Sequence, residues 1–273
     1  MVSDLYFETN HKLWDNWTRL HLERESEYRN LAYKLKSGET TLDEIEIKEL
    51  GGVSNKSLLH LQCHLGLDTL SWARMGAIAT GVDFSAQAIA YAQSLSKELD
   101  ISAEFICCDI YDLPTILERQ FDIVYTARGV LPWLPDLDRW AGIIAHCLKP
   151  GGTFYLMEGH PIRHILLPPR VDAIGKSIEH GYVHRAEPTR VEERGSYAAP
   201  EADTMHTAYY WTHGLGEIVT VLCSAGLRLE FLHEFSKVVE NCYSYEETEP
   251  GRYESRLRYN VAIPRMFSIR ATH

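Results

Sequence analysis

The chain has no long apolar run. None of its 273 residues belongs to a stretch approaching the roughly twenty apolar residues that a membrane-spanning helix needs. The first ten residues include Asp4 and Glu8 and no apolar core, so they do not resemble a secretory signal. We therefore expect no membrane insertion and a cytoplasmic location.

Positive charge is also scarce. The sequence has 27 lysines and arginines against 38 aspartates and glutamates, which gives a net charge of −11. Binding to nucleic-acid phosphates needs a cationic surface, and so does docking on an anionic membrane. The charge balance argues against DNA, RNA and membrane partners, although it does not exclude a protein substrate.

Cysteine pairs with metal-binding or redox spacing are missing. The six cysteines include no C-x-x-C pair, and most of them stand inside apolar runs. Such spacing favours buried, reduced thiols over disulfides or a metal site. The cysteines are Cys63, Cys107, Cys108, Cys147, Cys223 and Cys242.

Glycine is scarce where a nucleotide-binding loop normally has it. Residues 57–70 are predicted to form a buried strand, a tight loop that closes on Gly66, and the first turn of a helix. A second apolar strand ends in Asp83. A carboxylate at the tip of the next strand is how an α/β domain holds a ribose-bearing cofactor. Gln62 and His64 occupy the usual glycine positions, so the glycine count alone is a weak signal.

Strands and helices alternate as far as residue 158. Ser85 is a favourable N-cap for one of the helices, and a turn is expected at 149–152, where proline precedes two glycines. This alternation predicts a parallel, doubly wound sheet. The predicted strands are 58–63, 77–82, 103–108, 121–126 and 153–158.

The alternation stops at Gly159. Residues 160–212 lack a helical period, and 183–197 and 205–211 are predicted to be strands of an antiparallel insertion. An insertion after the fifth strand lies at the carboxyl edge of the sheet, where ligands bind. A helix ending at Gly226 and two further strands, 227–235 and 265–271, complete the chain.

The N-terminal region is rich in aromatic residues. Leu13, Trp17 and Leu20 have the spacing of a helix with one apolar stripe. Two interpretations stay open: a helix laid against the edge of the core, or a cap over a ligand pocket.

Four landmarks together resemble class I S-adenosylmethionine-dependent methyltransferases. The similarity runs over about 57–156 and resumes over about 214–272, and the run HLQCH at 60–64 further resembles a small-molecule subgroup. The landmarks are the 58–66 loop, GVDFS at 81–85, CDIYDLP at 108–114, and FDIVY at 121–125 with LKPGG at 148–152.

The resemblance implies a fold and a division of the chain. It implies an α/β, Rossmann-like, doubly wound and mostly parallel seven-stranded sheet with an antiparallel last strand. Residues 1–50 would form a helical cap, 51–159 and 213–273 the cofactor-binding domain, and 160–212 an inserted substrate-side lid.

The resemblance also implies roles in binding S-adenosyl-L-methionine, whose product is S-adenosyl-L-homocysteine. Asp83 would accept bonds from both ribose hydroxyls, and Asp109 from the adenine amino group. Phe84 and Ile110 would sandwich the purine, with the Ile110 backbone at its edge. At the methionine part, the Gly66 backbone would approach the ligand closely, and Thr126 would line this end of the site.

The loop departs from the family pattern at three positions. His60 replaces the usual acidic residue, and Gln62 and His64 replace two glycines. S-adenosylmethionine has no pyrophosphate, so Gln62 and His64 would contact the ligand carboxylate, line the substrate side, or only brace the loop. Three His-x-x-x-His pairs occur without the helical spacing of a metal pair, so we expect no metal. They are His60/His64, His160/His164 and His180/His184.

Methyl transfer needs alignment more than activation, because the sulfonium is already reactive. A neutral nucleophile also needs a base. His160 is the first candidate for that base, followed by His213 and Tyr6, although a simple turn role for His160 stays open. Glu158 is expected to orient a partner.

The expected function is methyl transfer to an oxygen, nitrogen or sulfur atom of a small molecule by a monomer or homodimer. One alternative is a regulatory protein that binds S-adenosylmethionine or S-adenosylhomocysteine without turnover. An NAD(P)-dependent oxidoreductase is a weaker alternative, because Gln62 and His64 stand where a pyrophosphate would approach.

Overall fold

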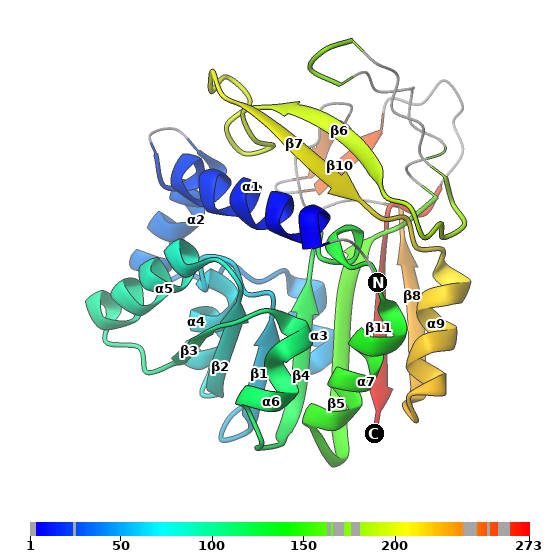
Figure 1. Cartoon of the computed structure of the whole chain (residues 1–273). Helices are drawn as coiled ribbons and strands as arrows, with labels where there is room; N and C mark the ends of the chain where they lie inside the picture. Colours follow the sequence, from blue (N-terminus) through cyan, green and yellow to red (C-terminus); the bar gives the residue numbers. More distant parts are fainter. Residues whose placement is uncertain are drawn as a thin grey trace.

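The central sheet has seven strands. The computed structural model describes residues 4–23, 26–162, 165, 172–175, 181–236, 245–249, 252–255 and 263–273. The strands lie in the order β3-β2-β1-β4-β5-β11-β8 (Figure 1). Neighbours are parallel except at β11, which is antiparallel to β5 and β8. The predicted mostly parallel sheet is confirmed. The bounds are β1 Ser57–Leu61, β2 Ile78–Asp83, β3 Glu104–Cys107, β4 Phe121–Ala127, β5 Leu148–Gly159, β8 Arg228–Phe235 and β11 Met266–Thr272.

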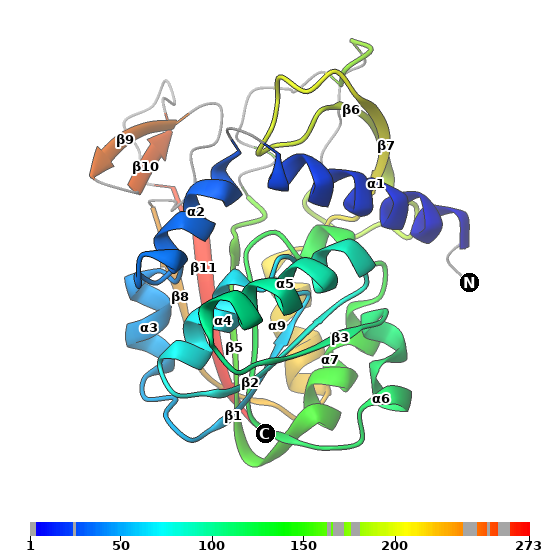
Figure 2. The same ribbon diagram turned by 90° about the vertical axis from the view of Figure 1, so that its left-hand side faces the viewer.

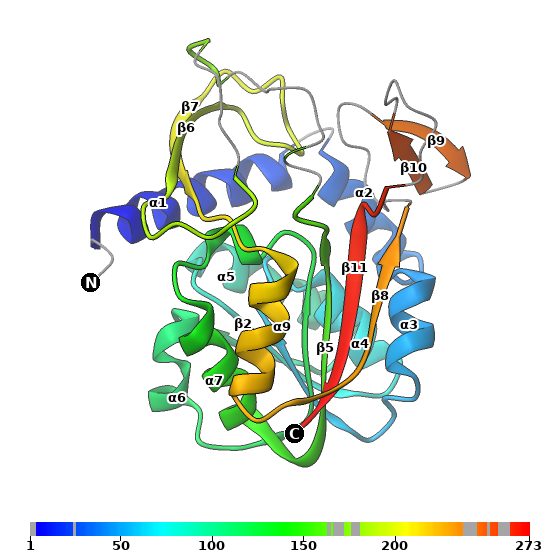
Figure 3. The same cartoon turned by 90° about the vertical axis from the view of Figure 1, so that its right-hand side faces the viewer.

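Helices cover both faces of the sheet. Because successive strand side chains point to opposite faces, Leu58 packs in one apolar cluster with Trp72, and Leu59 in another with Trp140. Figures 2 and 3 show helices on the two sides. The helices are α3 Glu44–Leu50, α4 Leu67–Arg74, α5 Ala86–Leu99, α6 Leu113–Ile116, α7 Leu137–Cys147 and α9 Leu215–Ser224.

The strand order reverses between β1 and β4. The chain runs outward from β1 to β2 and β3, and then returns to the other side of β1 with β4 and β5. In open α/β sheets, ligands bind at the carboxyl ends of the strands beside such a reversal. Short helical turns η1 (Ile110–Asp112) and η2 (Leu131–Trp133) follow β3 and β4.

Two N-terminal helices and a hairpin lie beyond this end of the sheet. Figure 1 shows α1 (Asp4–Leu22) crossing above the strands, with β6 (Thr189–Arg194) and β7 (Met205–Tyr210) above α1. The predicted apolar stripe of Leu13, Trp17 and Leu20 is buried in one cluster with Ala208 of β7. Ser26 caps α2 (Glu27–Lys36) by accepting from the amide of Arg29.

Three local predictions were wrong. Residues 149–152 continue strand β5 rather than forming a turn, because Gly151 bends the strand at φ +77° while its amide bonds the carbonyl of His273. The strand predicted to start at 183 begins only at Thr189. A hairpin of β9 (Tyr245–Glu249) and β10 (Arg252–Ser255) stands between β8 and β11, where we predicted no strands.

None of the helices in the described ranges combines the length and apolar character that crossing a membrane takes. The five cysteines that fall within those ranges are free thiols, but the predicted burial is wrong for Cys107 and Cys223, which are exposed. Cys242 lies outside the described ranges.

Candidate active site

A cavity of about 320 Å³ lies at the carboxyl end of the sheet. Its wall combines the loops that follow β1, β2, β3 and β4 with residues of α1 and α2. The volume falls in the range of about 300–1,000 Å³ that is usual for small-molecule sites. The cavity therefore occupies the position that the strand reversal predicts.

The loop after β1 has the backbone shape of a glycine loop without the glycines. Gln62 has φ +55° and His64 has φ +48°, a region that few non-glycine residues occupy. The amide of Cys63 bonds the carbonyl of Val82, and the amide of His64 bonds the carboxylate of Asp83. These bonds to β2 hold the loop open toward the cavity, which both Gln62 and His64 line. Strained backbone of this kind concentrates at functional sites.

Asp83 is the buried carboxylate at the tip of β2. One oxygen accepts from the amide of His64 at 2.8 Å and the other from the amide of Ser85 at 2.9 Å. Asp83 also lines the cavity. Burial raises its pKa to about 6, although these amides oppose the shift. Each oxygen has two acceptor sites, so Asp83 has capacity left for a diol donor.

The residues after β2 and β3 form an apolar slot with one acid. Phe84, Asp109 and Ile110 all line the cavity. Asp109 caps η1 by accepting from the amide of Tyr111 at 2.8 Å, and burial raises the pKa of its carboxyl. Phe7 and His11 of α1 pack on Phe84 with ring centroids 5.9 and 5.0 Å from its own. The slot suits a flat ring bearing an amino group.

A second part of the cavity wall carries paired charges. Arg128, which follows β4, lies 3.0 Å from Asp68 of α4 and 3.6 Å from the buried Glu46. Thr41 also contacts Asp68, and His60 bonds the hydroxyl of Thr69 at 2.8 Å. Arg128, Asp68 and His60 line the cavity. Because burial lowers the pKa of His60 to about 4, its ring is neutral at neutral pH.

An aromatic wall formed by Trp14, Tyr28, Trp133 and Tyr197 lines the cavity. The ring centroids of Trp14 and Trp133 are 5.1 Å apart, and the hydroxyls of Tyr28 and Tyr197 are 2.7 Å apart. The wall thus joins α1, α2, η2 and the insertion, which are distant in sequence.

A chain of hydrogen bonds runs behind the aromatic wall. The His64 ring lies 2.9 Å from that of His21, which in turn lies 3.1 Å from the hydroxyl of Ser196 in the insertion. Burial lowers the pKa of His64 to about 3 and, with the neighbouring His64, that of His21 to about 2. Both rings are therefore neutral hydrogen-bonding groups at neutral pH.

Comparison with known proteins matches this architecture. A family model described as a methyltransferase domain matches residues 59–156. An S-adenosylmethionine-dependent methyltransferase from Mesorhizobium loti superimposes with a TM-score of 0.58 at 19% identity, over 83% of this chain and 94% of that one. The chain has the methyltransferase fold. A glycopeptide N-methyltransferase solved with S-adenosylmethionine aligns with a TM-score of 0.54 at 14% identity, over 83% of this chain and 90% of that one.

Curated relatives match a shorter region. A ubiquinone biosynthesis O-methyltransferase from Coxiella burnetii is 33% identical over 103 residues, which are 38% of this chain and 43% of the relative. One from Chromobacterium violaceum is 27% identical over 152 residues, which are 56% of this chain and 60% of the relative. The chain thus spans about half the length of these relatives.

Within this fold, six of the eight predicted cofactor residues line the cavity: Gln62, His64, Asp83, Phe84, Asp109 and Ile110. Gly66 and Thr126 are not part of its lining. At Gly66 a Cβ would lie 2.6 Å from the ring of Phe105 and 2.7 Å from Ala92, so core packing requires the glycine there. Thr126 is buried and donates to the carbonyl of Leu61 at 3.3 Å.

None of the three predicted bases lines the cavity. His160 Nε2 lies 2.9 Å from Glu234 Oε1. The hydroxyl of Tyr6 donates to Glu187 at 3.1 Å. His213 contacts Leu134 and Glu217. The structure thus gives each of these side chains a partner outside the cavity wall. Of the three predicted histidine pairs, His60 and His64 bond different partners, and the other two include His164 and His180, which lie outside the described residues.

Glu158 holds part of the cavity wall through backbone amides. Its buried carboxylate accepts from the amides of Gly129 and Val130 at 2.7 and 2.8 Å. Gly129 and Val130 line the cavity. The Glu158 carboxyl group therefore fixes the loop that follows β4.

Sequence reasoning missed the aromatic wall and the charged pair of Arg128 and Asp68. Their members come from segments separated by many tens of residues, so no local period or motif links them. Trp14 and Tyr28 belong to the aromatic N-terminal region, whose composition alone does not show what these side chains face.

Proposed function

We propose that the chain is an S-adenosylmethionine-dependent methyltransferase that acts on a small molecule. The observation that carries the proposal is Asp83, a buried carboxylate at the tip of β2 that opens onto a cavity at the strand reversal. This position suits the ribose of a nucleoside, and the methyltransferase-domain match over 59–156 includes it.

The groups around Asp83 fit the nucleoside part of S-adenosylmethionine. Asp83 would accept from the ribose hydroxyls, and Asp109 from the adenine amino group. Phe84 and Ile110 offer the apolar surface for the purine. All four line one cavity, and bonds to an ionised carboxylate are stronger than neutral ones.

The charged pair fits the amino-acid end. Free S-adenosylmethionine ends in a zwitterion, whose ammonium and carboxylate need one group of each sign. Asp68 and Arg128 line the cavity 3.0 Å apart, and they would pair with the ammonium and the carboxylate respectively. His60 would stand beside them as a neutral imidazole.

The aromatic wall would receive the methyl acceptor. S-adenosylmethionine supplies a methyl group on a positively charged sulfur, which leaves as a thioether. The chain's own task is to align the acceptor and exclude water. Trp14, Trp133 and Tyr197 suit a flat or apolar acceptor. His64 at the edge of this wall can accept a hydrogen bond from an acceptor hydroxyl or amine.

The acceptor atom would be oxygen, nitrogen or sulfur. The names of the curated relatives favour oxygen, whereas the glycopeptide enzyme with the same fold is named for nitrogen. The net charge of −11 favours a small acceptor over nucleic acid. Free thiols fit work in a reducing compartment such as the cytoplasm, by a monomer or homodimer.

A binding protein without turnover is the main alternative, because none of the predicted bases lines the cavity. To test turnover, the protein is incubated with S-adenosylmethionine and panels of phenols, amines, thiols and carboxylates, and release of S-adenosylhomocysteine is measured. We expect acceptor-dependent release with at least one panel member, and loss of that release in Trp14→Ala. The exposed Tyr33→Ala is the matched control and should keep the activity.

One outcome of the turnover test would contradict the proposal. Tight binding of S-adenosylhomocysteine together with no acceptor-dependent release from any panel would favour the regulatory alternative.

A further inference from the structure

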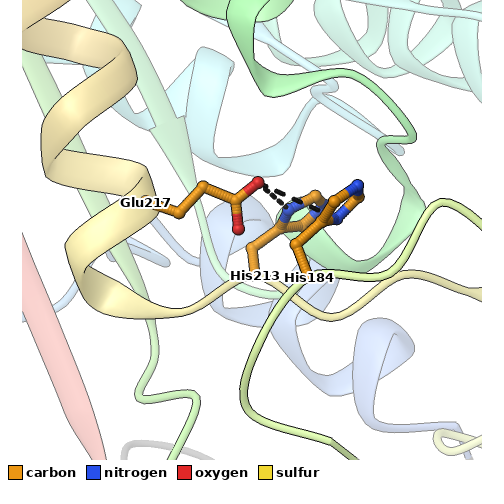
Figure 4. Close-up of side chains that lie close together, drawn as sticks. All are labelled: His184, His213 and Glu217. Carbon is orange, nitrogen blue, oxygen red and sulfur yellow. Dashed lines mark hydrogen bonds and ion pairs between the residues drawn. The ribbon is translucent and has the colours of Figure 1, made fainter.

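Two histidines and a glutamate meet away from the cavity. His184 lies within the insertion, His213 follows its end, and Glu217 lies on the first turn of α9. One potential ligand atom from each lies within 4.8 Å of the others. None of the three residues lines the cavity. Figure 4 shows both rings directed at the same carboxylate group.

The geometry approaches that of a metal site. Glu217 Oε1 lies 3.2 Å from His213 Nδ1 and 3.8 Å from His184 Nδ1. The two rings are stacked, with centroids 4.9 Å apart and planes 12° apart. Ligands about 2.0–2.2 Å from a tetrahedral zinc ion lie somewhat over 3 Å from one another. Small side-chain movements would bring the three atoms to such positions.

The hydrogen bonding of His213 leaves two acceptors facing each other. Its Nε2 lies 2.7 Å from the carbonyl oxygen of Leu134, and a carbonyl only accepts, so Nε2 carries the proton. In a neutral ring Nδ1 then has a lone pair, which faces a carboxylate oxygen of Glu217 at 3.2 Å. Two acceptors at this distance need a shared cation, either a proton or a metal ion.

Glu217 offers a second unmatched atom. Its Oε2 is buried and has no hydrogen-bond partner among the described residues. A buried carboxylate oxygen without a partner is costly. Binding both carboxylate oxygens to one ion would remove this cost as well.

We propose that His184 Nδ1, His213 Nδ1 and the Glu217 carboxylate bind a divalent transition-metal ion, with zinc as the best match. Two imidazoles and a carboxylate suit zinc. The Leu134 carbonyl orients His213 through the far nitrogen, as the outer partners of metal-bound histidines do. His184 Nδ1 donates to the carbonyl of Thr212 at 3.3 Å, because a carbonyl only accepts, so binding of the ion moves this proton to His184 Nε2 and leaves Nδ1 free to coordinate.

The ion has a structural role. It joins a point inside the insertion, His184, and the residue just after the insertion, His213, to α9 and, through Leu134, to the loop after β4. Leu134 lines the cavity, so the ion fixes the base of the segment that covers the candidate acceptor side. The inference does not depend on the proposed methyl transfer, because it uses none of the cavity contacts of S-adenosylmethionine.

The test uses the full chain, stripped with a chelator and titrated with Zn²⁺ in a calorimeter. We expect one equivalent to bind and the melting temperature to rise, because an ion that binds the native state stabilises it. Replacement of Zn²⁺ by Co²⁺ should give the visible absorption of a tetrahedral nitrogen–oxygen site. Glu217→Gln and His184→Ala should each weaken binding at least tenfold.

His233→Gln is the matched control. His233 also pairs with a glutamate, Glu49 at 2.7 Å, but in the described part of the chain it belongs to no three-ligand group. This variant should bind Zn²⁺ as the wild type does.

Three results would overturn the inference: no saturable binding of one equivalent, binding in Glu217→Gln and His184→Ala that equals the wild type, or two protonated nitrogens on His213 in the presence of Zn²⁺ by NMR. The last result would show that a proton joins the two acceptors. His184 is the more exposed ligand, so its variant keeps the test valid if Glu217→Gln does not fold.

Discussion

Gln62 and His64 hold positive φ angles at positions where this kind of loop normally has glycine. Two backbone hydrogen bonds hold these angles. The amide of Cys63 bonds the carbonyl of Val82, and the amide of His64 bonds the carboxylate of Asp83, so both anchor the loop on β2. Because these positions carry side chains instead of glycine, the strained loop places two polar groups on the cavity wall. Asp83 therefore shapes the loop as well as facing the cavity, and the two roles come from the same carboxylate.

The raised pKa of Asp83 gives a prediction about pH. Burial raises this pKa to about 6, and ribose hydroxyls bond best to the ionised form. Affinity for S-adenosylhomocysteine should therefore be constant well above pH 6 and should fall as the pH drops through about 6, because protonation competes with binding. The fall approaches about tenfold per pH unit below that point. Calorimetric titration between pH 8 and pH 5 measures it.

Variants at nearby positions control this experiment. Asp83→Asn should bind at least about tenfold more weakly at pH 8, since a bond to a charged group contributes about 1.5–3 kcal/mol, and its affinity should vary less with pH. The exposed Asp112→Asn should behave as the wild type does. Equal affinity of Asp83→Asn and the wild type at pH 8 would refute the ribose placement.

Single residues at strand ends were predictable, and residues that meet only in the folded chain were not. Asp83 and Asp109 stand directly at predicted strand ends, so alternation of elements located them. Gly66 is expected to approach a ligand, and the structure shows that Phe105 and Ala92 also leave no room for a Cβ there; the ligand role stays a prediction. A glycine needed for packing and one needed for a ligand look the same in sequence.

At the scale of elements, α1 packs on the hairpin and also contributes to the cavity wall. Leu13 and Trp17 pack in an apolar cluster that includes Ala208 of β7, whereas Phe7 and Trp14 line the cavity. The role of α1 as a cap over the cavity stays a prediction. The helical period of α1 could be predicted from the sequence. The surface on which it packs could not, because that surface belongs to the 160–212 insertion.

Asn10 joins α1 to the edge of β7. Its side-chain amide donates to the carbonyl of Tyr209 at 2.8 Å and accepts from the amide of Tyr209 at 2.9 Å, as a neighbouring strand would. Asn10→Ala should lower the free energy of unfolding by about 1–3 kcal/mol, because it leaves backbone groups of Tyr209 unpaired. It should also speed hydrogen exchange at the Tyr209 amide.

Asn16→Ala is the control for this prediction. Asn16 bonds only the carbonyl of Lys12 in its own helix within the described contacts, so its removal should change stability by less than about 0.5 kcal/mol. If both variants lose the same stability, or if exchange at Tyr209 is unchanged in Asn10→Ala, the two-bond bridge does not hold the helix to the hairpin.

The end of a helix could be predicted from the sequence where a nearby side chain caps it. Ser85 caps α5 as predicted, with its hydroxyl accepting from the amide of Ala88. The turn expected at 149–152 failed because the paired strands carry β5 through Gly151, which bonds the chain's last residue, His273. A contact between residues far apart in the sequence thus outweighs the local preference of proline and glycine for a turn.

At the scale of the molecule, the loops of the sheet line the side proposed for the cofactor, and the added segments line the opposite side. The loops after β1, β2 and β3 carry the groups that fit a nucleoside, and α1, α2, η2 and the insertion carry the aromatic wall. The sheet could be predicted because its strands follow a regular alternation. The acceptor side could not, because it is assembled from segments with no shared pattern.

The most direct test of the cofactor assignment is thermal melting with four ligands. S-adenosylmethionine, S-adenosylhomocysteine, NAD and NADP are each added to the full chain at equal concentration, and the melting temperature is compared with that of the protein alone. A ligand that binds only the native state raises it. The account predicts a rise with the first two and none with NAD or NADP. A rise with NAD and none with S-adenosylmethionine would contradict it.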